Sequence, residues 1–443
     1  MKKLILVFVA GILFISAIAQ ETEATRLLRA QNKEFIPEII KLNEHVYTAV
    51  GFDGSNASMV IGKDGIVIID ALRALGAAEK VAAKFRKISN KPVKALIYTH
   101  GHADHTGGTS AFIGNNKNVM IIARKGFKEE LQSNSPVEPI LKLRNARQFG
   151  RNLPMHDIIN RGVAAGSTSK DRVGEGYIKP NFTFQDSLKI TLAGTVFELY
   201  AADGETNDEL FVWCPEEKAL FAGDNYYKAF PNLYAIRGSQ YRDVKAWGES
   251  VKKMSSFPVE YLIPGHTRPL TGKSTIYSNL QNYSTAILSV YQQTIRYMNK
   301  GFTLQQTVDH VNLPDSLVNK DNLQEFYGSV AWGVRSIYLH YVGWFDGNPT
   351  NLFPLSSIQE SKNMIALVGS EKKMMKHLAK ALKKGNYQWG LQLADYLLQT
   401  DYEIAKVTEA KIKLLRALAL NQKNAPARNY YLSYAHELEV SLN

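Results

Sequence analysis

A short cluster of histidines and an aspartate behind an apolar segment constrains this chain more than any other feature. Residues 93–98 form an apolar run typical of a buried strand, and His100, His102, Asp104 and His105 follow it directly. Alternate side chains of an extended chain point to the same side, so His100, His102 and Asp104 can converge. A turn then brings His105 to the same place. Imidazole and carboxylate ligands suit zinc or a related transition metal, so the sequence predicts a metal site at the end of this strand.

Three more candidate ligands lie downstream, each in a loop after a predicted strand. Glu205 follows the strand ending at residue 200, Asp224 follows the strand ending at residue 222, and His266 follows the strand ending at residue 263. Taken singly, each fits an exposed turn residue better than a ligand. Their order behind the first cluster favours a metal-binding role, because a site with two metals needs ligands beyond the first four.

The composition narrows the functional classes. The single cysteine, Cys214, excludes an internal disulfide framework and any metal site built on several cysteines. The formal net charge of +12 suits anionic substrates or surfaces. The basic residues at 372–376 and 383–384 lie on helix-like stretches, as expected for solvated faces. We find no nucleic-acid-binding motif and expect no nucleic-acid partner.

The N-terminus has the pattern of a secretory signal. Two lysines precede an apolar run over residues 4–15, and Ala17 and Ala19 form an Ala-x-Ala cleavage site. We expect a signal peptide over residues 1–19, cleaved after Ala19, and a periplasmic or secreted protein. The run is too short for a good membrane span, so no stable membrane anchor is expected. An uncleaved anchor is the alternative.

The pattern of strand and helix signals divides the chain. From about residue 45 to 265 the two signals alternate, which indicates an α/β fold with mixed sheets. A Gly- and Ser-rich stretch at about 161–181 is expected to be a long functional loop. Past about residue 272 the strand signals stop and only helices are expected. The turn-rich segment 343–349 separates two helical groups, and we place a domain boundary near residue 355.

The length of 443 residues indicates two or three domains. The expected strands cover residues 46–50, 58–62, 66–69, 93–98, 119–123, 188–192, 195–200, 209–213, 220–222 and 261–263. The expected helices cover residues 71–88, 278–298, 322–342, 357–368, 371–384, 388–400 and 402–420.

The order of the candidate ligands resembles that of the metallo-β-lactamase superfamily, whose fold is an αβ/βα sandwich with metals at one edge. The resemblance covers residues of about 45 to 270. The superfamily usually has a histidine as its next ligand, but no histidine occurs between His156 and His266, and Glu205 takes that place. This exchange is typical of the linear alkyl sulfatases, which hydrolyse dodecyl sulfate and similar esters.

Further segments resemble the same branch and extend the similarity to roughly residues 40–440. Four of these segments are residues 215–220, 232–238, 327–330 and 343–349. Two more, residues 385–389 and 428–432, resemble the dimerisation domain of this branch. The resemblance implies a metallo-β-lactamase-like catalytic domain over residues 20–355, with a helical extension from about 272. It implies an all-α dimerisation domain over residues 356–443 and a homodimer formed through these C-terminal helices.

The resemblance also implies two zinc ions per chain, which activate a water molecule for hydrolysis of the ester. One zinc ion would be held by His100, His102 and Glu205, and the other by Asp104, His105 and His266. Asp224 would bridge the two ions, so Asp104 and Asp224 are the expected catalytic carboxylates around the metal-bound water.

Two residues are implied in substrate binding. The branch binds sulfate at the positions of Asn232 and Arg237, and the guanidinium of Arg237 offers a charged fork of donors that suits a tetrahedral oxyanion. Asp70 is expected either to orient a ligand histidine or to cap a turn. The substrate would be a small anionic alkyl ester whose tail needs an apolar channel. At most one or two of these aromatic residues are expected to line it: Phe326, Tyr327, Trp332, Trp344 and Phe345.

Two departures from the branch leave other functions open. Asp224 is shorter than the glutamate common at the bridging position, and Pro231 replaces a histidine that often precedes the asparagine. We also expect the sterol-carrier-like domain of longer members to be absent. The alternatives are a metallo-hydrolase of another ester, a lactone, a β-lactam or a phosphodiester, and a non-catalytic, metal-stabilised binding protein.

Overall fold

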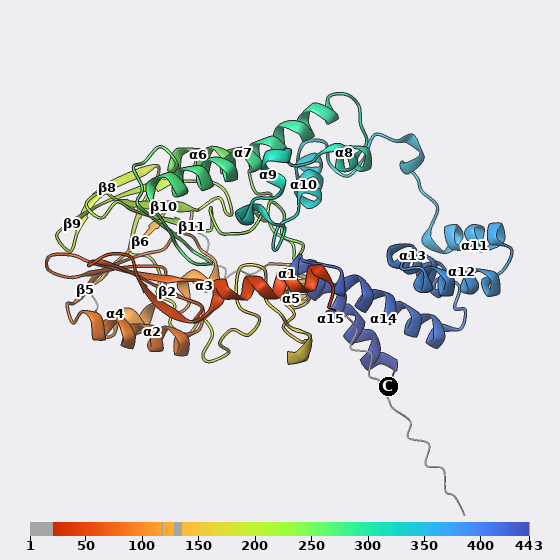
Figure 1. Cartoon of the computed structure of the whole chain (residues 1–443), viewed down its shortest axis with the longest axis horizontal. Helices are drawn as coiled ribbons and strands as arrows, with labels where there is room; N and C mark the ends of the chain where they lie inside the picture. Colours follow the sequence, from red (N-terminus) through yellow and green to blue (C-terminus); the bar gives the residue numbers. More distant parts are fainter. Residues whose placement is uncertain (1–20, 117, 128–134, 443) are drawn as a thin grey trace, which may run out of the picture.

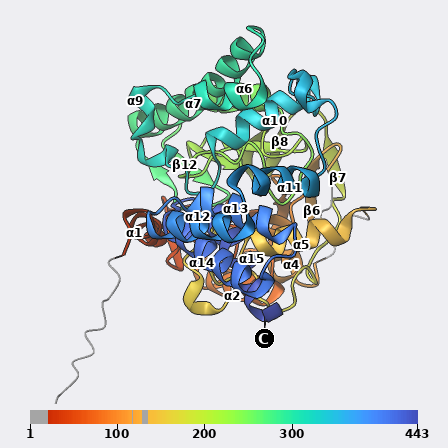
Figure 2. The same ribbon diagram turned by 90° about the vertical axis from the view of Figure 1, so that its right-hand side faces the viewer.

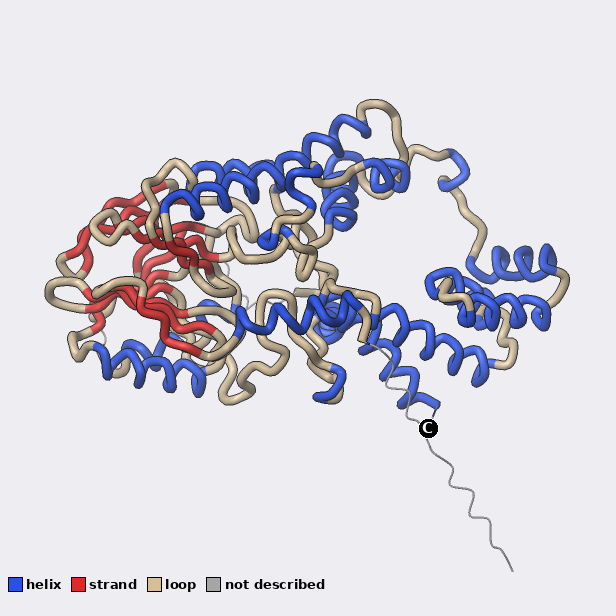
Figure 3. Tube along the Cα trace, viewed as in Figure 1, coloured by secondary structure: helices blue, strands red, loops and turns tan. Residues whose placement is uncertain are grey.

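The computed structural model describes residues 21–442, with the exception of 117 and 128–134. Two β-sheets lie face to face, helices cover their outer sides, and a helical part extends from one end (Figures 1 and 3). This is the αβ/βα sandwich with a following all-α part that the sequence predicts. The predicted signal peptide lies outside the described residues.

The sheets have the mixed topology expected. The first follows the order β1 to β7, and the second follows the order β13-β12-β11-β10-β9-β8. Neighbours from β4 to β7 are parallel, as are β11 and β12, and the other pairs are antiparallel. The first sheet consists of β1 (Glu38–Lys41), β2 (Val46–Val50), β3 (Ala57–Ile61), β4 (Ile66–Ile69), β5 (Val93–Ile97), β6 (Met120–Arg124) and β7 (Phe182–Phe184). The second consists of β8 (Ser187–Leu192), β9 (Thr195–Ala201), β10 (Leu210–Cys214), β11 (Ala219–Gly223), β12 (Tyr261–Pro264) and β13 (Leu270–Thr271).

Side chains of the central strands point alternately to the two faces of the first sheet, and an apolar core lies on each face. Val67 and Ile69 of β4 belong to the apolar cluster between the sheets, which includes Phe197 of β9. Ile68 belongs to the cluster on the opposite side, beneath α2 (Leu75–Ile88) and α4 (Thr109–Ile113). Because successive side chains of a strand point to opposite faces, a strand buried on both sides must be apolar throughout. This explains the continuous apolar runs in the sequence.

The second sheet is covered by α6 (Val244–Met254) and the long α7 (Lys273–Met298), which pack against each other. Trp247 of α6 is fully buried and shares a cluster with Leu220 and Leu262 of the sheet. The helical extension continues through α8 (Leu304–His310), α9 (Asp315–Val318) and α10 (Val330–Val342). The two sheets are thus fixed between layers of helices.

The C-terminal helices leave the body and return to it. A small bundle of α11 (Ser357–Val368), α12 (Glu371–Lys383) and α13 (Tyr387–Leu398) lies far from the sheets and has its own core (Figure 1). Then α14 (Ile404–Leu420) and α15 (Ala425–Leu442) run back, and Figure 2 views these helices in front of the body. α15 packs against α5 (Glu138–Gln148), where Arg147 donates two hydrogen bonds of 3.0 and 2.5 Å to Glu437.

The structure corrects the prediction of one helix over residues 322–342, because α10 begins only at Val330. The backbone before it bonds to a distant segment, and Gly328 N–H donates to Phe230 O at 3.0 Å. A Cβ at Gly328 would lie 1.9 Å from Pro231 O, so this close approach requires glycine. These long-range contacts replace the hydrogen bonds of a continuing helix.

Other predicted elements lie within a few residues of their observed bounds, and the stretch at about 161–181 is irregular as expected. The prediction missed the strands β1, β7 and β13. It also missed the helices α1 (Glu23–Ala30), α3 (Ala103–Thr106), α4, α5, α6, α8, α9 and α15. Among the described helices, none is both long and apolar enough to span a membrane. The domain boundary near residue 355 stays a prediction.

Candidate metal centre

Six of the seven predicted ligands come together at the edge of the sandwich where strands of both sheets end. β5 of the first sheet ends just before the loop that carries His100 and His102 into α3 (Ala103–Thr106). In the second sheet, β11 ends directly before Asp224, and β12 ends just before His266. Because β11 and β12 are parallel neighbours, their carboxyl ends meet at the same edge.

Gly223 permits a close approach at the end of β11. Its φ is +55°, and a Cβ there would lie 2.1 Å from Glu209 Oε1. That same carboxylate oxygen accepts a hydrogen bond of 2.9 Å from the backbone N–H of Asp224. The glycine therefore lets Glu209 fix the backbone that carries the central carboxylate of the site.

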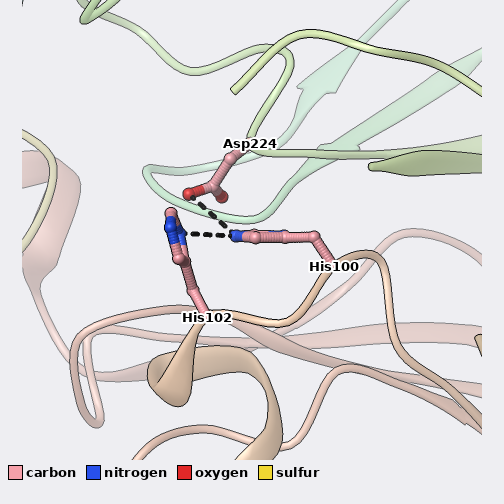
Figure 4. A group of neighbouring side chains, drawn as sticks. All are labelled: His100, His102 and Asp224. Atoms are coloured by element: carbon pink, nitrogen blue, oxygen red, sulfur yellow. Dashed lines mark hydrogen bonds and ion pairs between the residues drawn. The ribbon is translucent and has the colours of Figure 1, made fainter. Parts of the chain in front are cut away.

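A first group of potential ligand atoms is formed by His100, His102 and Asp224, whose donor atoms all lie within 4.8 Å of one another. His100 Nε2 lies 2.9 Å from His102 Nδ1 and 3.9 Å from Asp224 Oδ2. Figure 4 shows the two imidazoles and the carboxylate pointing toward one another from both sheets. This arrangement offers two nitrogens and one oxygen to a single ion.

A second group is formed by Asp104, His105 and His266, also within 4.8 Å of one another. Asp104 Oδ2 lies 4.0 Å from His105 Nε2 and 3.6 Å from His266 Nε2. Asp224 connects the two groups, because its Oδ1 lies 3.4 Å from His105 Nε2 and its Oδ2 lies 3.1 Å from His266 Nε2. Asp224 is therefore placed where a bridging ligand between two ions would lie.

A buried carboxylate behind the site orients His105. Asp70 Oδ2 lies 2.8 Å from His105 Nδ1, and Asp70 also accepts hydrogen bonds from the backbone N–H and the hydroxyl of Thr99, each at 2.8 Å. With Nδ1 occupied, the ring presents Nε2 to the metal groups. Of the two roles expected for Asp70, the structure supports the one that orients a ligand histidine.

His266 and His100 also have contacts at Nδ1, and each ring presents its Nε2 to the centre. His266 Nδ1 donates to Gly54 O at 2.8 Å. His100 Nδ1 lies 3.1 Å from the hydroxyl of Thr99 and 3.3 Å from Glu209 Oε2. These outer contacts fix the ring orientations before any ion binds.

Exchange of Asp70 for asparagine is expected to weaken zinc binding by about 10- to 100-fold, because the ring of His105 loses its anionic partner. Competition with a chelator of known affinity measures this change. The matched control is Asp64→Asn, an exposed aspartate in the turn before β4, which should leave the zinc affinity unchanged. Equal affinity of the Asp70 and Asp64 variants would contradict the role of Asp70.

Glu205 has a different environment from the other predicted ligands. It is buried and lines the same cavity, but its Oε2 pairs with the buried guanidinium of Arg242. Burial raises the pKa of Glu205 to about 7, against the attraction of Arg242. Glu205 is not part of either group of converging ligand atoms, and its role as a metal ligand stays a prediction.

The residues of the two groups could hold a pair of metal ions, because some of their polar atoms are unsatisfied and their side chains are of the right chemical type. His105 Nε2 and Asp224 Oδ1 are buried without a hydrogen-bond partner among the described residues. Burial lowers the pKa of His100 to about 3, so its imidazole is neutral near pH 7, the form that binds a metal. Burial alone would raise the pKa of Asp224, but His266 and His105 hold it well below the usual range. Imidazoles and carboxylates together suit zinc.

A cavity of about 410 Å³ opens onto these groups. Arg237 and Tyr327 both lie in its wall, and the substrate-binding role of Arg237 stays a prediction. Asn232 is buried and is not among the lining residues; its backbone N–H donates to the hydroxyl of Tyr227 at 2.8 Å. Of the five aromatic candidates for a channel, Tyr327 alone is among the lining residues, while Trp344 is 72% exposed.

The structure shows partners that the sequence analysis missed. Glu209 Oε2 lies 3.3 Å from His100 Nδ1. Arg242 joins Glu205 to Asn232, because its Nη1 donates to Asn232 O at 2.5 Å. An acidic residue directly before an apolar strand was a usable signal for Glu209. Arg242 lies in an irregular segment before α6, and nothing in its local pattern marks it.

Comparison with known proteins identifies the family. The model of the metallo-β-lactamase superfamily matches residues 50–266, and that of the alkyl sulfatase dimerisation domain matches residues 303–441. A linear primary-alkylsulfatase of Pseudomonas sp. is 32% identical over 391 residues, which cover 87% of this chain and 74% of that relative. The chain belongs to the alkyl sulfatase family. Its predicted membership in this branch is thereby confirmed.

Other alkyl sulfatases support the assignment over nearly the whole chain. An alkyl/aryl-sulfatase of Saccharomyces cerevisiae and an (R)-specific secondary-alkylsulfatase of Pseudomonas sp. are each 27% identical, over 93% and 91% of this chain. This chain spans 65% and 63% of the length of these two relatives. The solved structure of the inverting sec-alkylsulfatase Pisa1 from Pseudomonas sp. has a TM-score of 0.84 and 25% identity, covering 94% of this chain and 67% of that alkyl sulfatase.

Proposed function

We propose that this alkyl sulfatase family member hydrolyses alkyl sulfate esters to an alcohol and sulfate with two zinc ions. The relatives named above are alkylsulfatases. For this chain, the observation that carries the proposal is that Asp224 joins two ligand groups on the same cavity as Arg237. A metal pair held by these groups and the guanidinium of Arg237 would both be in reach of one small molecule.

His100, His102 and Glu205 would hold one ion, Asp104, His105 and His266 the other, and Asp224 would bridge them. Glu205 has a second carboxylate oxygen besides the one on Arg242. When bound, the ions supply Lewis acidity and lower the pKa of water toward about 7.

The chain's own residues bind and orient the reactants. Arg237 carries a permanent charge and a planar fork of donors, which matches two oxygens of a sulfate group. Its backbone N–H donates to Gln148 Oε1 at 2.8 Å, and its guanidinium lies 5.7 Å from the centre of the Phe149 ring. Asp104, which lines the cavity, can accept a hydrogen bond from the attacking water. Asn232 is buried and does not line this cavity, so its contact with the sulfate rests on the resemblance alone.

A substrate panel tests this function. Residues 20–443 with zinc should release sulfate from dodecyl sulfate, and a chelator should abolish the release. Nitrocefin, a lactone and a phosphodiester, assayed in parallel, represent the other hydrolases of this fold. Turnover of one of these without sulfate release would replace the proposal by that activity. Two bound zinc ions without turnover of any substrate would support a binding protein.

We also propose that the protein is exported, because residues 1–19 have the pattern of a signal peptide. Expression of the full chain in a bacterial host should give a periplasmic or secreted product that begins at Gln20. Recovery of the intact N-terminus in the cytoplasm would contradict export.

A homodimer is the proposed assembly, since residues 303–441 match the alkyl sulfatase dimerisation domain. Deletion of the residues after 355 is expected to give a monomer or an insoluble chain. The deletion removes the proposed interface and also uncovers Leu153, which packs with Ala419 and Leu432. Light scattering on the full and shortened chains measures the mass, and an unchanged, soluble dimer of the shortened chain would contradict the proposal.

A further inference from the structure

The cavity is lined by several cations besides the candidate metal-binding carboxylates. Arg73, Arg151, Arg161 and Arg237 all line it. Lys142 lines it too, but this lysine pairs with Glu138 at 2.7 Å. A single sulfate monoester carries one negative charge, so one guanidinium fork would suffice to bind it. Arg73 Nη2 donates to Ser169 O and Arg151 Nε donates to Asn145 Oδ1, each at 2.9 Å, but these partners carry no charge. The additional positive charges therefore exceed what hydrolysis of a plain alkyl sulfate requires, because its tail needs apolar walls.

Three of the arginines are grouped around one aromatic ring. The guanidinium carbons of Arg151, Arg161 and Arg237 lie 5.7, 5.9 and 5.7 Å from the centre of the Phe149 ring. Such a ring attracts cations through its face and can hold them near one another. The anion site expected at Arg237 thus continues along the wall toward Arg151 and Arg161.

Arg161 is a partly buried arginine on this cavity, and Asp53 and Asp104 are the nearby anions within the described residues. Its Nε is buried and has no hydrogen-bond partner there. Burial and the nearby charges of Arg151 and Arg73 lower the pKa of Arg161 to about 10, against the attraction of Asp53 and Asp104. Because these two carboxylates do not offset burial and the like charges, a further anion beside Arg161 would stabilise it.

The loop that presents Arg161 is firmly attached to the body. The neighbouring Asn160 is fully buried; its side chain donates to Leu28 O at 2.9 Å, and its carbonyl accepts from Asn429 Nδ2 at 3.2 Å. The backbone N–H of Arg161 itself donates to Ala164 O at 2.9 Å. The N-terminal and C-terminal helices therefore fix this cation on the cavity, as a preorganised binding residue requires.

We propose that the preferred substrates carry a second anionic group, a carboxylate or a second sulfate, a few carbons from the sulfate ester, and that Arg161 binds it together with Arg73 and Arg151. This rests on the proposed function, in which Arg237 binds the ester sulfate. When the carboxylates of the centre are neutralised by zinc, the cavity as a whole is cationic and suits a dianion.

Binding of two non-hydrolysable probes tests the second anion site directly. The zinc-loaded full-length protein should bind hexane-1,6-disulfonate at least about tenfold more tightly than hexane-1-sulfonate in a calorimeter. Arg161→Gln should reduce this preference to within about twofold, with little change for the monosulfonate. Arg172→Gln is the matched control, because Arg172 pairs with Glu79 on the surface at 2.6 Å; it should keep the preference.

Three results would overturn the second anion site. The first is equal binding of the two probes, and the second is no binding of either. The third is an equal loss of affinity for both probes in Arg161→Gln, because this result would place Arg161 on the ester sulfate. Thermal unfolding of both variants shows whether each is folded, and Arg161→Lys, which keeps a charge, should retain part of the preference.

Sulfate release from hexyl sulfate and 6-(sulfooxy)hexanoate separates this inference from the proposed function. Faster release from the carboxylated ester supports both. A disulfonate preference that depends on Arg161, without release from either ester, would overturn the hydrolase and keep the anion site. Equal sulfate release from both esters, together with equal binding of the two probes, would support the hydrolase and overturn the second anion site.

Discussion

Replacement of His102 by alanine is expected to abolish both metal binding at the first group and hydrolysis of dodecyl sulfate. His102 Nδ1 lies 2.9 Å from His100 Nε2, so the two rings converge on one point with Asp224. Loss of one nitrogen leaves too few ligands for a tightly held ion. We expect sulfate release to fall by at least about a thousandfold, because water without a metal has a pKa far above neutral. Elemental analysis and a sulfate assay measure the two effects.

The matched control for His102 is His156→Ala. The side chain of His156 is 79% exposed and lies outside the cavity, so this variant should keep the zinc content and the activity. A His102 variant with full zinc and full activity would show that the first group is not the metal site.

Exchange of Arg237 for alanine is expected to lower kcat/KM on sulfate esters by about 100- to 1,000-fold while the zinc content stays intact. Charge-assisted, bidentate contacts are the strong class of hydrogen bond, and Arg237 lines the cavity beside the ligand groups without belonging to either. Arg237→Lys should recover only part of the loss, because an ammonium lacks the planar fork. Steady-state kinetics on dodecyl sulfate and zinc analysis provide the measurement.

Arg86→Ala removes the same charge from the exposed face of α2, outside the cavity. It should leave the kinetic constants unchanged. Equal activity of the Arg237 and Arg86 variants would remove the assignment of Arg237 to the sulfate. Loss of zinc in the Arg237 variant would instead indicate a structural effect on the centre.

The fold and the convergence of the candidate ligands could be predicted because both depend on local signals. A continuous apolar run marks a strand buried on both faces, and a polar residue directly after it lies at the sheet edge. His100, Asp224 and His266 each satisfy this rule, and the structure brings all three together. Resemblance to a known branch then ordered the candidates into two groups.

The contacts between distant segments could not be predicted in this way. Arg242 reaches Glu205 only through the folded chain, and the segment before Val330 gives up helical bonds for a backbone contact with Phe230. The cations that line the cavity, such as Arg73 and Arg161, come from separate loops with no common sequence pattern. Such features depend on tertiary packing, which a propensity or a motif does not encode.

A zinc titration of the metal-free protein, followed by sulfate release from dodecyl sulfate, measures metal dependence and activity together. We expect the activity of residues 20–443 to rise with added zinc and to level off at two ions per chain. His102→Ala should remain inactive at every zinc concentration. A correctly folded protein that holds two zinc ions and releases no sulfate would contradict the proposed alkyl sulfate hydrolysis.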